Sequence, residues 1–467
     1  MPVLAYDSRR LILDVFDKKV IIQNVNIYAI SNNILIYNID NCLYKLNLTL
    51  PECHEQVTYN ICFYKFTTEI HELKLSENGK NVGVLLTNGE FYLFSNFTLT
   101  FSKKKINGFG ISDNLMGYET KNNFYLENIN SAGMVDKSLN SFFKYFVFNS
   151  FCLVFTLKLK DGENNYCHKM IKISKKNITV VKTFDSIVDV NCKCSDDGNY
   201  VLVNLSTSYV KNSYFASTAL YVYDVAQEKF EKMNKLSNIL DFTFIKNGFC
   251  VVYGNQPSYV AIFNMDLSFR EKFPSGIRNR IYFNRQESYV VLAGFEQLAG
   301  NVEVYDAKSK EKLSIANELG ASKVLWDTTG SYYYVSTLNY LKEDNRINKY
   351  DYYGRLISSE CFDSLCDVSV YGLNEEFIEL SPPKEKFVET IEEAYVPAIL
   401  KNKNLRKGVS QPIKAKQNEN EDELINKLEI IEALKQKMGS NQKLETYELN
   451  LILNEGKIKK KLEDLKK

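Results

Sequence analysis

Two stretches of the sequence repeat one order of features. Residues 251–266 read VVYGNQPSYVAIFNMD, and residues 290–307 read VVLAGFEQLAGNVEVYDA. Each contains an apolar run, a turn led by glycine, a second run in which apolar and polar residues alternate, and then an aspartate. Such runs predict short β-strands, buried on one face or on both. We therefore expect Gly254, Gly294 and Gly300 to lie in tight turns of two adjacent, equivalent units.

Similar turn signals recur along most of the chain, at spacings that average in the low forties. They begin at Ser31, Ser76, Ile111, Phe148, Ser195, Lys246, Asn284, Asp327 and Gly372. A period of about 40–45 residues with four short strands per unit is typical of a β-propeller. One four-stranded blade cannot bury both of its faces, whereas blades stacked around an axis can. The sequence predicts an all-β, WD40-like propeller of about nine blades over residues 1–381; a pair of β-sandwiches, the alternative, would not require the period.

The dipeptides at the ends of the alternating runs support this interpretation. WD-type repeats carry a Trp-Asp pair at the end of the third strand. Here the pair is Tyr-Asp, at Tyr223-Asp224, Tyr305-Asp306 and Tyr350-Asp351. The chain's single tryptophan, Trp326, occupies a first-strand position instead. The period therefore supports the propeller more strongly than the dipeptides do.

Composition excludes several other classes of protein. The 467-residue chain is 45% hydrophobic and 25% charged, with a net charge of +1, so it has no overall attraction for nucleic acid or membrane. The first residues lack the features of a signal peptide, and no apolar run is long enough to span a bilayer. The ten cysteines lie scattered in strand-like runs and are interpreted as reduced core thiols. We expect a cytoplasmic protein without a membrane partner.

The periodic pattern changes near residue 381. Residues 382–420 have little apolar periodicity and are predicted to form a flexible basic linker. Residues 421–467 carry two apolar stripes at helical spacing, separated by GSNQ at 439–442, which predicts a C-terminal helical hairpin. A hairpin of this size would be only marginally stable by itself. We therefore expect it to dock on a larger partner.

The residues needed for catalysis or cofactor binding are scarce. The chain has three histidines, and its cysteine pairs lack the spacing of zinc ligands. No G-x-x-x-x-G-K-[ST] motif is present, so a P-loop is not expected. Paired carboxylates such as Asp196-Asp197 fall in turns, where solvated charge is the ordinary interpretation. We predict no enzyme activity, no metal and no cofactor.

Local basic clusters are the remaining candidates for a binding role. The linker cations are the clearest, because no acid lies among them and no apolar face accompanies them. A flexible cationic segment suits the binding of phosphate through counterion release. A turn before a predicted strand and a lysine-rich part of the last helix are further candidates. The predicted RNA- or ribosome-binding residues are Lys401, Lys403, Arg406, Lys407, Lys414 and Lys416 in the linker, Arg278, Asn279 and Arg280 in the turn, and Lys457, Lys459, Lys460 and Lys461 in the helix.

Several motifs, in their order and distances, resemble a known family. These are VVYGNQPSYVAIFN at 251–264, SGIRNRIYFN at 275–284 and VVLAGFEQLAGNVEVYD at 290–306. They resemble the propeller of eukaryotic translation initiation factor 2A, the single-chain factor. AYVPAILKNKNLRKG at 394–408 and the region from Ile425 to Leu465 are similar to later segments of that family. The resemblance runs from about Asn191 onward, and the earlier residues match in cadence only.

Three departures from the family pattern, together with a linker that is short for the family, fit a divergent, shortened member. Ile277 stands where the family has proline, Glu296-Gln297 replace Gly-Asn, and Val396-Pro397-Ala398 replace Arg-Pro-Pro. The resemblance implies a non-enzymatic factor that associates with the small ribosomal subunit and promotes initiator methionyl-tRNA binding without GTP. The implied partners are the small subunit, initiator methionyl-tRNA and mRNA, with other initiation factors as partners of the C-terminal helices.

Two further classes of function remain open from the sequence. One is a propeller scaffold in another complex, such as the b subunit of initiation factor 3, which places an RNA-recognition domain before a similar propeller. No RNP-like aromatic motif precedes Asn191 here. The other class is a propeller hydrolase or lyase, which would need a base, nucleophile or metal that the sequence does not offer.

Overall fold

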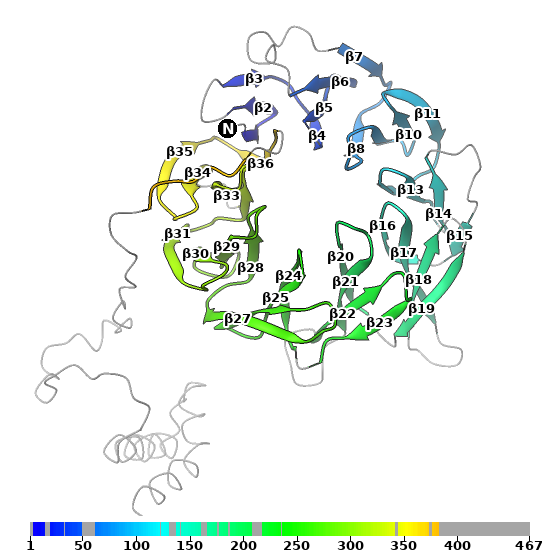
Figure 1. Ribbon diagram of the computed structural model, residues 1–467. Helices are drawn as coiled ribbons and strands as arrows, with labels where there is room; N and C mark the ends of the chain where they lie inside the picture. Colours follow the sequence, from blue (N-terminus) through cyan, green and yellow to red (C-terminus); the bar gives the residue numbers. More distant parts are fainter. Residues whose placement is uncertain are drawn as a thin grey trace, which may run out of the picture. The chain divides into compact units, whose positions relative to one another are not determined.

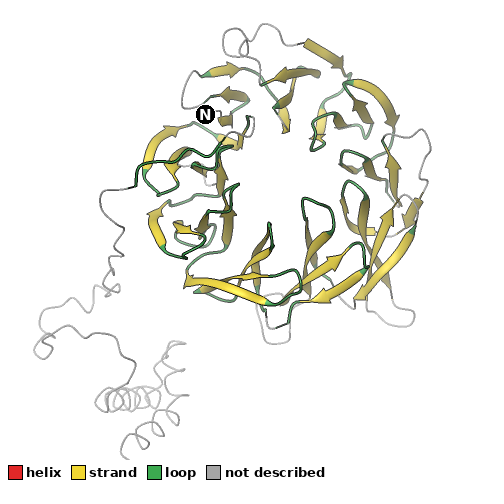
Figure 2. Ribbon diagram, viewed as in Figure 1, coloured by secondary structure: helices red, strands yellow, loops and turns green. Residues whose placement is uncertain are grey.

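The computed structural model is a ring of nine four-stranded antiparallel sheets. It describes residues 3–382, apart from residues 15–18, 32, 49–60, 122, 130–136, 141, 160–165, 175–176, 185–186, 208–216, 235, 341–343 and 373–375. Every regular element of the described residues is a strand (Figure 2). The predicted nine-bladed propeller is therefore confirmed, and the sandwich alternative is wrong. The linker predicted over residues 382–420 and the hairpin predicted over 421–467 lie outside the described residues, apart from Pro382.

The blades follow one another in sequence around the ring (Figure 1). Blade 1 contains β4 (Ile27–Ser31), β5 (Ile34–Ile39), β6 (Cys42–Asn47) and β7 (Ile61–Lys65). Blade 2 contains β8 (Ile70–Leu75), β9 (Asn81–Leu86), β10 (Phe91–Ser95) and β11 (Thr98–Lys103). Blade 3 contains β12 (Gly108–Ile111), β13 (Leu115–Glu119), β14 (Asn123–Asn128) and β15 (Lys137–Asn140). Blade 4 contains β16 (Phe142–Val147), β17 (Phe151–Leu159), β18 (Tyr166–Ser174) and β19 (Ile178–Phe184).

The second half of the ring has the same construction. Blade 5 contains β20 (Asp189–Cys194), β21 (Tyr200–Thr207), β22 (Ser217–Asp224) and β23 (Lys229–Lys232). Blade 6 contains β24 (Ile239–Ile245), β25 (Gly248–Tyr253), β26 (Ser258–Phe263) and β27 (Phe269–Gly276). Blade 7 contains β28 (Arg280–Phe283), β29 (Tyr289–Ala293), β30 (Asn301–Asp306) and β31 (Lys312–Asn317). Blade 8 contains β32 (Lys323–Trp326), β33 (Tyr332–Thr337), β34 (Arg346–Asp351) and β35 (Leu356–Cys361).

The ninth blade joins the two ends of the ring. Its first strand is β36 (Leu365–Val370), and its other three are β1 (Val3–Asp7), β2 (Arg10–Leu13) and β3 (Val20–Ile22). β36 pairs with β1 in antiparallel register, from Val3 opposite Val370 to Asp7 opposite Leu365. Ladder hydrogen bonds between the chain's early and late residues therefore close the circle. The sequence did not predict this closure, because the period gives the number of blades but not where the ring is joined.

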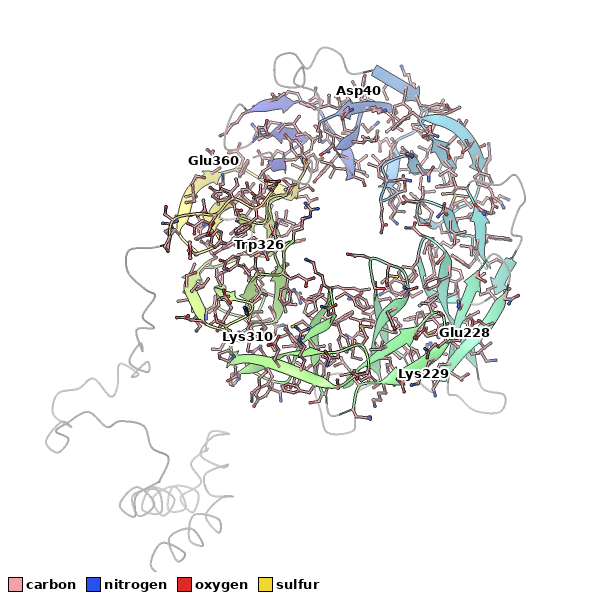
Figure 3. All side chains as sticks on the ribbon, viewed as in Figure 1. Asp40, Glu228, Lys229, Lys310, Trp326 and Glu360 are labelled. Atoms are coloured by element: carbon pink, nitrogen blue, oxygen red, sulfur yellow. The ribbon has the colours of Figure 1, made fainter. Side chains whose placement is uncertain are left out.

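The hydrophobic core is divided among the junctions between blades. Nine clusters of buried apolar residues occur among the described residues, and each one joins two neighbouring blades. The second strands are buried on both faces; every residue of β9, for example, is buried. The fourth strands are more exposed, as in β27. In Figure 3, Trp326 of a first strand lies nearer the axis than Glu360 of a fourth strand.

The two quoted stretches occupy equivalent places in neighbouring blades. Residues 251–266 contribute to β25 and β26 of blade 6, and residues 290–307 to β29 and β30 of blade 7. Both contribute to one core cluster. Gly254 and Gly300 have left-handed φ angles of 92° and 81°, as tight turns led by glycine require. Gly294 serves a different purpose: a Cβ there would lie 2.6 Å from the carbonyl oxygen of Ile277, so the residue permits a close approach of two loops.

The antiparallel order gives the ring two different ends. At one end, strand one turns into strand two and strand three into strand four; we call this the turn end. At the other, strand two turns into strand three and the chain crosses to the next blade; we call this the crossover end. The Tyr-Asp pairs close the third strands at the turn end, as predicted, since β22, β30 and β34 end at Asp224, Asp306 and Asp351.

The chain after β36 continues across the turn end of blade 8. The ring of Phe377 packs against the rings of Tyr352 and Tyr289, at 5.2 and 6.2 Å between centroids. The Leu380 amide donates to the Tyr352 hydroxyl at 2.9 Å, and the Ile378 amide donates to Ser331 Oγ at 2.7 Å. The described residues up to 382 therefore belong to the ring's packing.

Candidate functional site

The turn from Gly276 to Arg280 contains two arginines that were predicted to bind RNA. It lies at the crossover end, between blades 6 and 7. β27 ends at Gly276, and β28 begins at Arg280. A Cβ at Gly276 would collide with the guanidinium of Arg278. The glycine therefore leaves room for that side chain to fold back into the junction.

Arg278 is buried, with 1% of its surface exposed. Its Nη2 lies 3.2 Å from Glu303 Oε2, and it donates to the Pro274 carbonyl at 2.8 Å. The guanidinium lies over the Tyr305 ring, 5.3 Å from its centroid. The prediction that Arg278 presents its guanidinium to RNA at a blade edge is wrong, because a buried cation paired with a buried carboxylate joins the two blades instead.

Burial changes the proton affinity of the aromatic partner in this network. The pKa of Tyr305 is raised because burial disfavours its phenolate. The charge of Arg278 partly offsets this rise, and the charge of Glu303 adds to it. Lys312 Nζ also contacts Glu303, 2.9 Å from Oε1. Glu303 therefore has cationic partners from its own blade and from the preceding turn.

Asn279 and Arg280 are arranged differently from Arg278. The Asn279 side chain makes two hydrogen bonds with Phe295, donating to its carbonyl and accepting from its amide, both at 3.0 Å. Its amide thus fastens the turn to the β29–β30 loop. Arg280 pairs with Glu296, and about a third of its side chain is exposed, at 32%. Of the three predicted residues in this turn, Arg280 is the one whose charge reaches solvent.

Large apolar side chains are exposed at the crossover end of blades 6 to 8. Tyr259, Ile277, Leu319 and Tyr340 each expose more than half of their surface, up to 78% for Tyr340. Tyr259 lies at the start of β26, and the other three lie in loops of blades 6 to 8. The loops contact one another; for instance, Ser258 Oγ donates to the Arg278 carbonyl at 2.7 Å. Such a surface suits docking to a macromolecule.

Lysines of the first strands connect neighbouring blades near the axis. Lys144 Nζ donates to the Val190 carbonyl at 2.6 Å and to Asp189 Oδ1 at 2.8 Å in the next blade. Two equivalent sets have the same geometry: Lys193 with Asp241 and Phe242, and Lys323 with Asp367 and Val368. In all three, the acceptors are an aspartate and the apolar residue after it. These lysines hold blades together.

Sequence reasoning missed these connections although two signals were present. An Asp followed by Val or Phe recurs in three first strands, at Asp189, Asp241 and Asp367. Glu303 lies among valines and tyrosine in the strand NVEVYD, which signals a carboxylate that needs a buried cation. Neither signal resembles a catalytic or nucleic-acid motif, so a search for chemistry passes over both.

The carboxylates, thiols and imidazoles of the described part of the chain do not gather around a metal site. No group of three or more His, Cys, Asp or Glu side chains there is placed to hold a metal ion. Asp197 accepts hydrogen bonds from Ser195 Oγ at 2.5 Å and from the Asn199 amide at 3.1 Å, which lower its pKa and stabilise the turn. The Asp196-Asp197 pair thus belongs to a strand-to-strand turn. No helix of the described residues could cross a membrane.

The remaining predicted binding residues lie outside the described residues. They are Lys401, Lys403, Arg406, Lys407, Lys414 and Lys416 of the predicted linker, and Lys457, Lys459, Lys460 and Lys461 of the predicted last helix.

Comparison with known proteins identifies the relatives of this chain. The family model "Eukaryotic translation initiation factor eIF2A" matches residues 182–368. The chain is 34% identical over 110 residues to eukaryotic translation initiation factor 2A of Drosophila melanogaster, which covers 23% of this chain and 17% of the relative. It is 25% identical over 215 residues to the Saccharomyces cerevisiae factor of that name, covering 42% of this chain and 32% of the relative. The resemblance to this family is confirmed.

A second initiation factor and a solved structure are also similar. The B subunit of eukaryotic translation initiation factor 3 from Xenopus laevis is 23% identical over 198 residues, covering 40% of this chain and 29% of the relative. The crystal structure of a eukaryotic initiation factor superimposes with a TM-score of 0.63 at 17% identity, covering 79% of this chain and 97% of that one. That structure supports the fold. The matched stretches span less than two thirds of the length of each sequence relative.

Proposed function

We propose that the chain is a cytoplasmic translation initiation factor that associates with the small ribosomal subunit. In this proposal it promotes the binding of initiator methionyl-tRNA on mRNA without hydrolysing GTP and without catalysing a reaction of its own. The family match over residues 182–368 is the observation on which the proposal rests. These residues contain blades 5 to 8 and most of β36.

The geometry of the ring suits a docking role. The crossover end of blades 6 to 8, within the matched residues, exposes Tyr259, Ile277, Leu319 and Tyr340. An exposed apolar surface of this kind is typical of a site that contacts a macromolecule. We propose that this end contacts the small subunit, with Arg280 as one of its contributing cations.

The basic residues beyond the ring are proposed to contact RNA. Six cations between residues 401 and 416 have no acid among them. Their charge suits the phosphates of ribosomal RNA or tRNA, without reading the base sequence. The lysines at 457–461 and the predicted helices around them are proposed to contact the small subunit or another initiation factor.

Sedimentation of tagged protein through a gradient of cell extract tests the association. We expect co-migration with small subunits, and its loss when Tyr340→Ser and Leu319→Ser are combined. The matched control replaces Leu356 and Ile357, two exposed apolar residues of β35, with serine. Migration of the unaltered protein at the top of the gradient would contradict the proposal.

The likeness to the B subunit of initiation factor 3 supports a second candidate, a scaffold in a multi-subunit complex. Affinity purification separates the two functions. A scaffold would be recovered in stoichiometric amounts with the same protein partners after the ribosomes are removed, whereas a single-chain factor would be recovered largely alone.

A further inference from the structure

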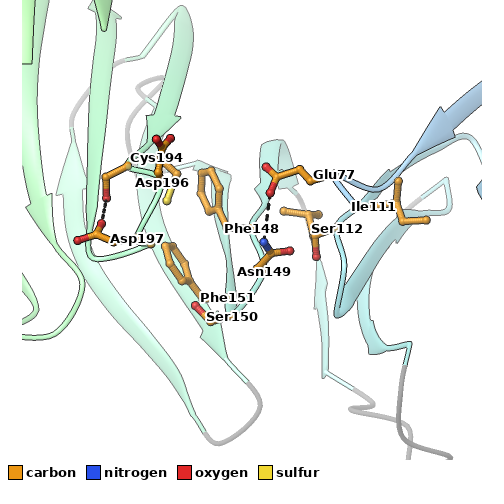
Figure 4. Close-up of a pocket in the computed structure, with 13 residues that line it drawn as sticks. Glu77, Ile111, Ser112, Phe148, Asn149, Ser150, Phe151, Cys194, Asp196 and Asp197 are labelled. Atoms are coloured by element: carbon orange, nitrogen blue, oxygen red, sulfur yellow. Dashed lines mark hydrogen bonds between the residues drawn. The ribbon is translucent and has the colours of Figure 1, made fainter. Parts of the chain in front are cut away.

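A cavity of about 530 Å³ lies at the turn end, between the first turns of blades 2 to 5 (Figure 4). Ile111, Val147, Phe148, Phe151 and Cys194 form its apolar part. Its volume is in the range of ordinary ligand pockets, about 300–1,000 Å³. It lies at the opposite end of the ring from Arg280 and Tyr340, so the surface proposed to contact the ribosome does not include it.

Three carboxylates line the same cavity, and no lysine, arginine or histidine is among its lining residues. Glu77 belongs to the turn of blade 2, and Asp196 and Asp197 belong to the turn of blade 5. Glu77 and Asp196 are exposed. Asn149 Nδ2 donates to Glu77 Oε2 at 3.3 Å, which helps to hold that carboxylate at the rim.

The thiol of Cys194 lies in the wall of the cavity, close to the same carboxylates. Its pKa is raised to about 11, first because the thiol is buried and then because Asp197, Glu77 and Asp196 disfavour a thiolate. Carboxylates from two blades therefore act on one point of the wall. The cavity therefore combines three carboxylates with an apolar wall that includes the partly exposed ring of Phe148.

We propose that this cavity binds the arginine or lysine side chain of a basic peptide segment in a partner protein. The side chain's aliphatic part would lie against the partly exposed ring of Phe148, and its cationic head would meet Glu77 and Asp196. An anionic ligand would be repelled. An apolar ligand would remove water from the carboxylates without replacing their hydrogen bonds. A cationic side chain on an extended segment satisfies both parts of the wall.

Binding of a short arginine-containing peptide in a Gly-Ser background, and of its citrulline counterpart, tests this site in the full chain. We expect the arginine peptide to bind and the citrulline peptide to bind at least about tenfold more weakly, since charge-assisted hydrogen bonds are lost. The double variant Glu77→Gln and Asp196→Asn should weaken the binding of the arginine peptide by a similar factor. The matched control, Asp266→Asn with Glu311→Gln, removes the same charge from exposed turns of blades 6 and 7 and should change affinity by less than about twofold. Equal losses in both variants, or no preference for arginine, would overturn the proposal.

Thiol labelling at Cys194 gives an independent readout. A cationic methanethiosulfonate reagent should modify Cys194 faster than an anionic one, relative to the ratio at Cys361, which is exposed on β35. The arginine peptide should protect Cys194 from modification, and the double variant should reduce the preference for the cationic reagent. Mass spectrometry of the peptide that contains Cys194 resolves the site. Faster reaction with the anionic reagent would contradict the negative potential on which the site depends.

Discussion

The cations of the ring and those between residues 401 and 416 differ in their surroundings. In the ring, Arg278 is paired with Glu303, and the first-strand lysines such as Lys193 contact an aspartate and a carbonyl of the next blade. Between Glu393 and Glu419, by contrast, the sequence contains six cations and no acid. These paired cations of the ring therefore stabilise the fold, whereas we propose that the cations between residues 401 and 416, which have no acid near them in the sequence, bind a ligand. A basic residue in a sequence has no fixed use until its partners are known.

The largest effect on binding is expected from removing the charge that has no acidic neighbours. Replacing Lys401, Lys403, Arg406, Lys407, Lys414 and Lys416 together with glutamine should weaken binding to small subunits. It should also lower the slope of log K against log salt by roughly 0.7–0.9 for each phosphate that is no longer bound. The melting temperature of the ring should hardly change. Binding measured between low and moderate salt checks this, and equal affinity and slope for both proteins would leave these residues as a spacer.

The largest effect on stability is expected at a buried cation that is paired with a carboxylate. Arg278→Ala leaves Glu303 buried with Lys312 as its remaining cationic partner. The free energy of unfolding should therefore fall by about 3 kcal/mol. Denaturant unfolding followed by circular dichroism measures the change. The double variant Arg278→Met with Glu303→Met should be less destabilised than Arg278→Ala, because it removes both charges of the buried pair together. An unchanged denaturation midpoint for Arg278→Ala would mean that the pair does not hold blades 6 and 7 together.

The sequence predicted those features that depend on repetition. The period gave the number of blades, and the Tyr-Asp pairs gave the ends of three third strands, because each blade must satisfy the same packing independently. The closure of β36 on β1 was not predictable in this way, because it joins residues that are not part of one repeat. Arg278 was misassigned because its partner lies 25 residues later in another blade, and charge patterning cannot show that distance in space.

One departure from the family pattern also acquires a physical explanation. The resemblance places glycine at the position of Glu296, and the structure pairs Glu296 with Arg280. The loop therefore supplies its own carboxylate to an exposed arginine. Sequence comparison could show that this position differs, but only the fold brings the two side chains together across the junction.

Replacing glycine by valine should lower the stability by different amounts at the two ends of the ring. Gly300→Val at the crossover end must adopt a φ near 81° and would collide with the carbonyl oxygen of Glu318, so we expect a cost of about 1–3 kcal/mol. Gly198→Val at the turn end has a similar φ of 73° but no atom within 4 Å of the added Cβ, so its cost should be about 1 kcal/mol. Comparing the two denaturation midpoints separates the collision from the backbone strain. Equal costs would show that backbone strain alone accounts for Gly300.

The smallest effect is expected at Arg280, two residues from the largest stability effect. Its side chain is 32% exposed and its partner Glu296 is 63% exposed, so Arg280→Gln should cost less than about 1 kcal/mol. A partly exposed guanidinium at the crossover end can also contact a phosphate, in which case the salt slope for binding to small subunits should fall by roughly 0.7–0.9, the value for one phosphate. Glu296→Gln is the matched control, because it breaks the same ion pair and leaves the cation free. If Arg280→Gln lowers the slope and Glu296→Gln does not, the ring also contributes one binding charge. If Arg280→Gln changes stability as much as Arg278→Ala does, then exposure does not separate the charges that bind from those that hold the fold.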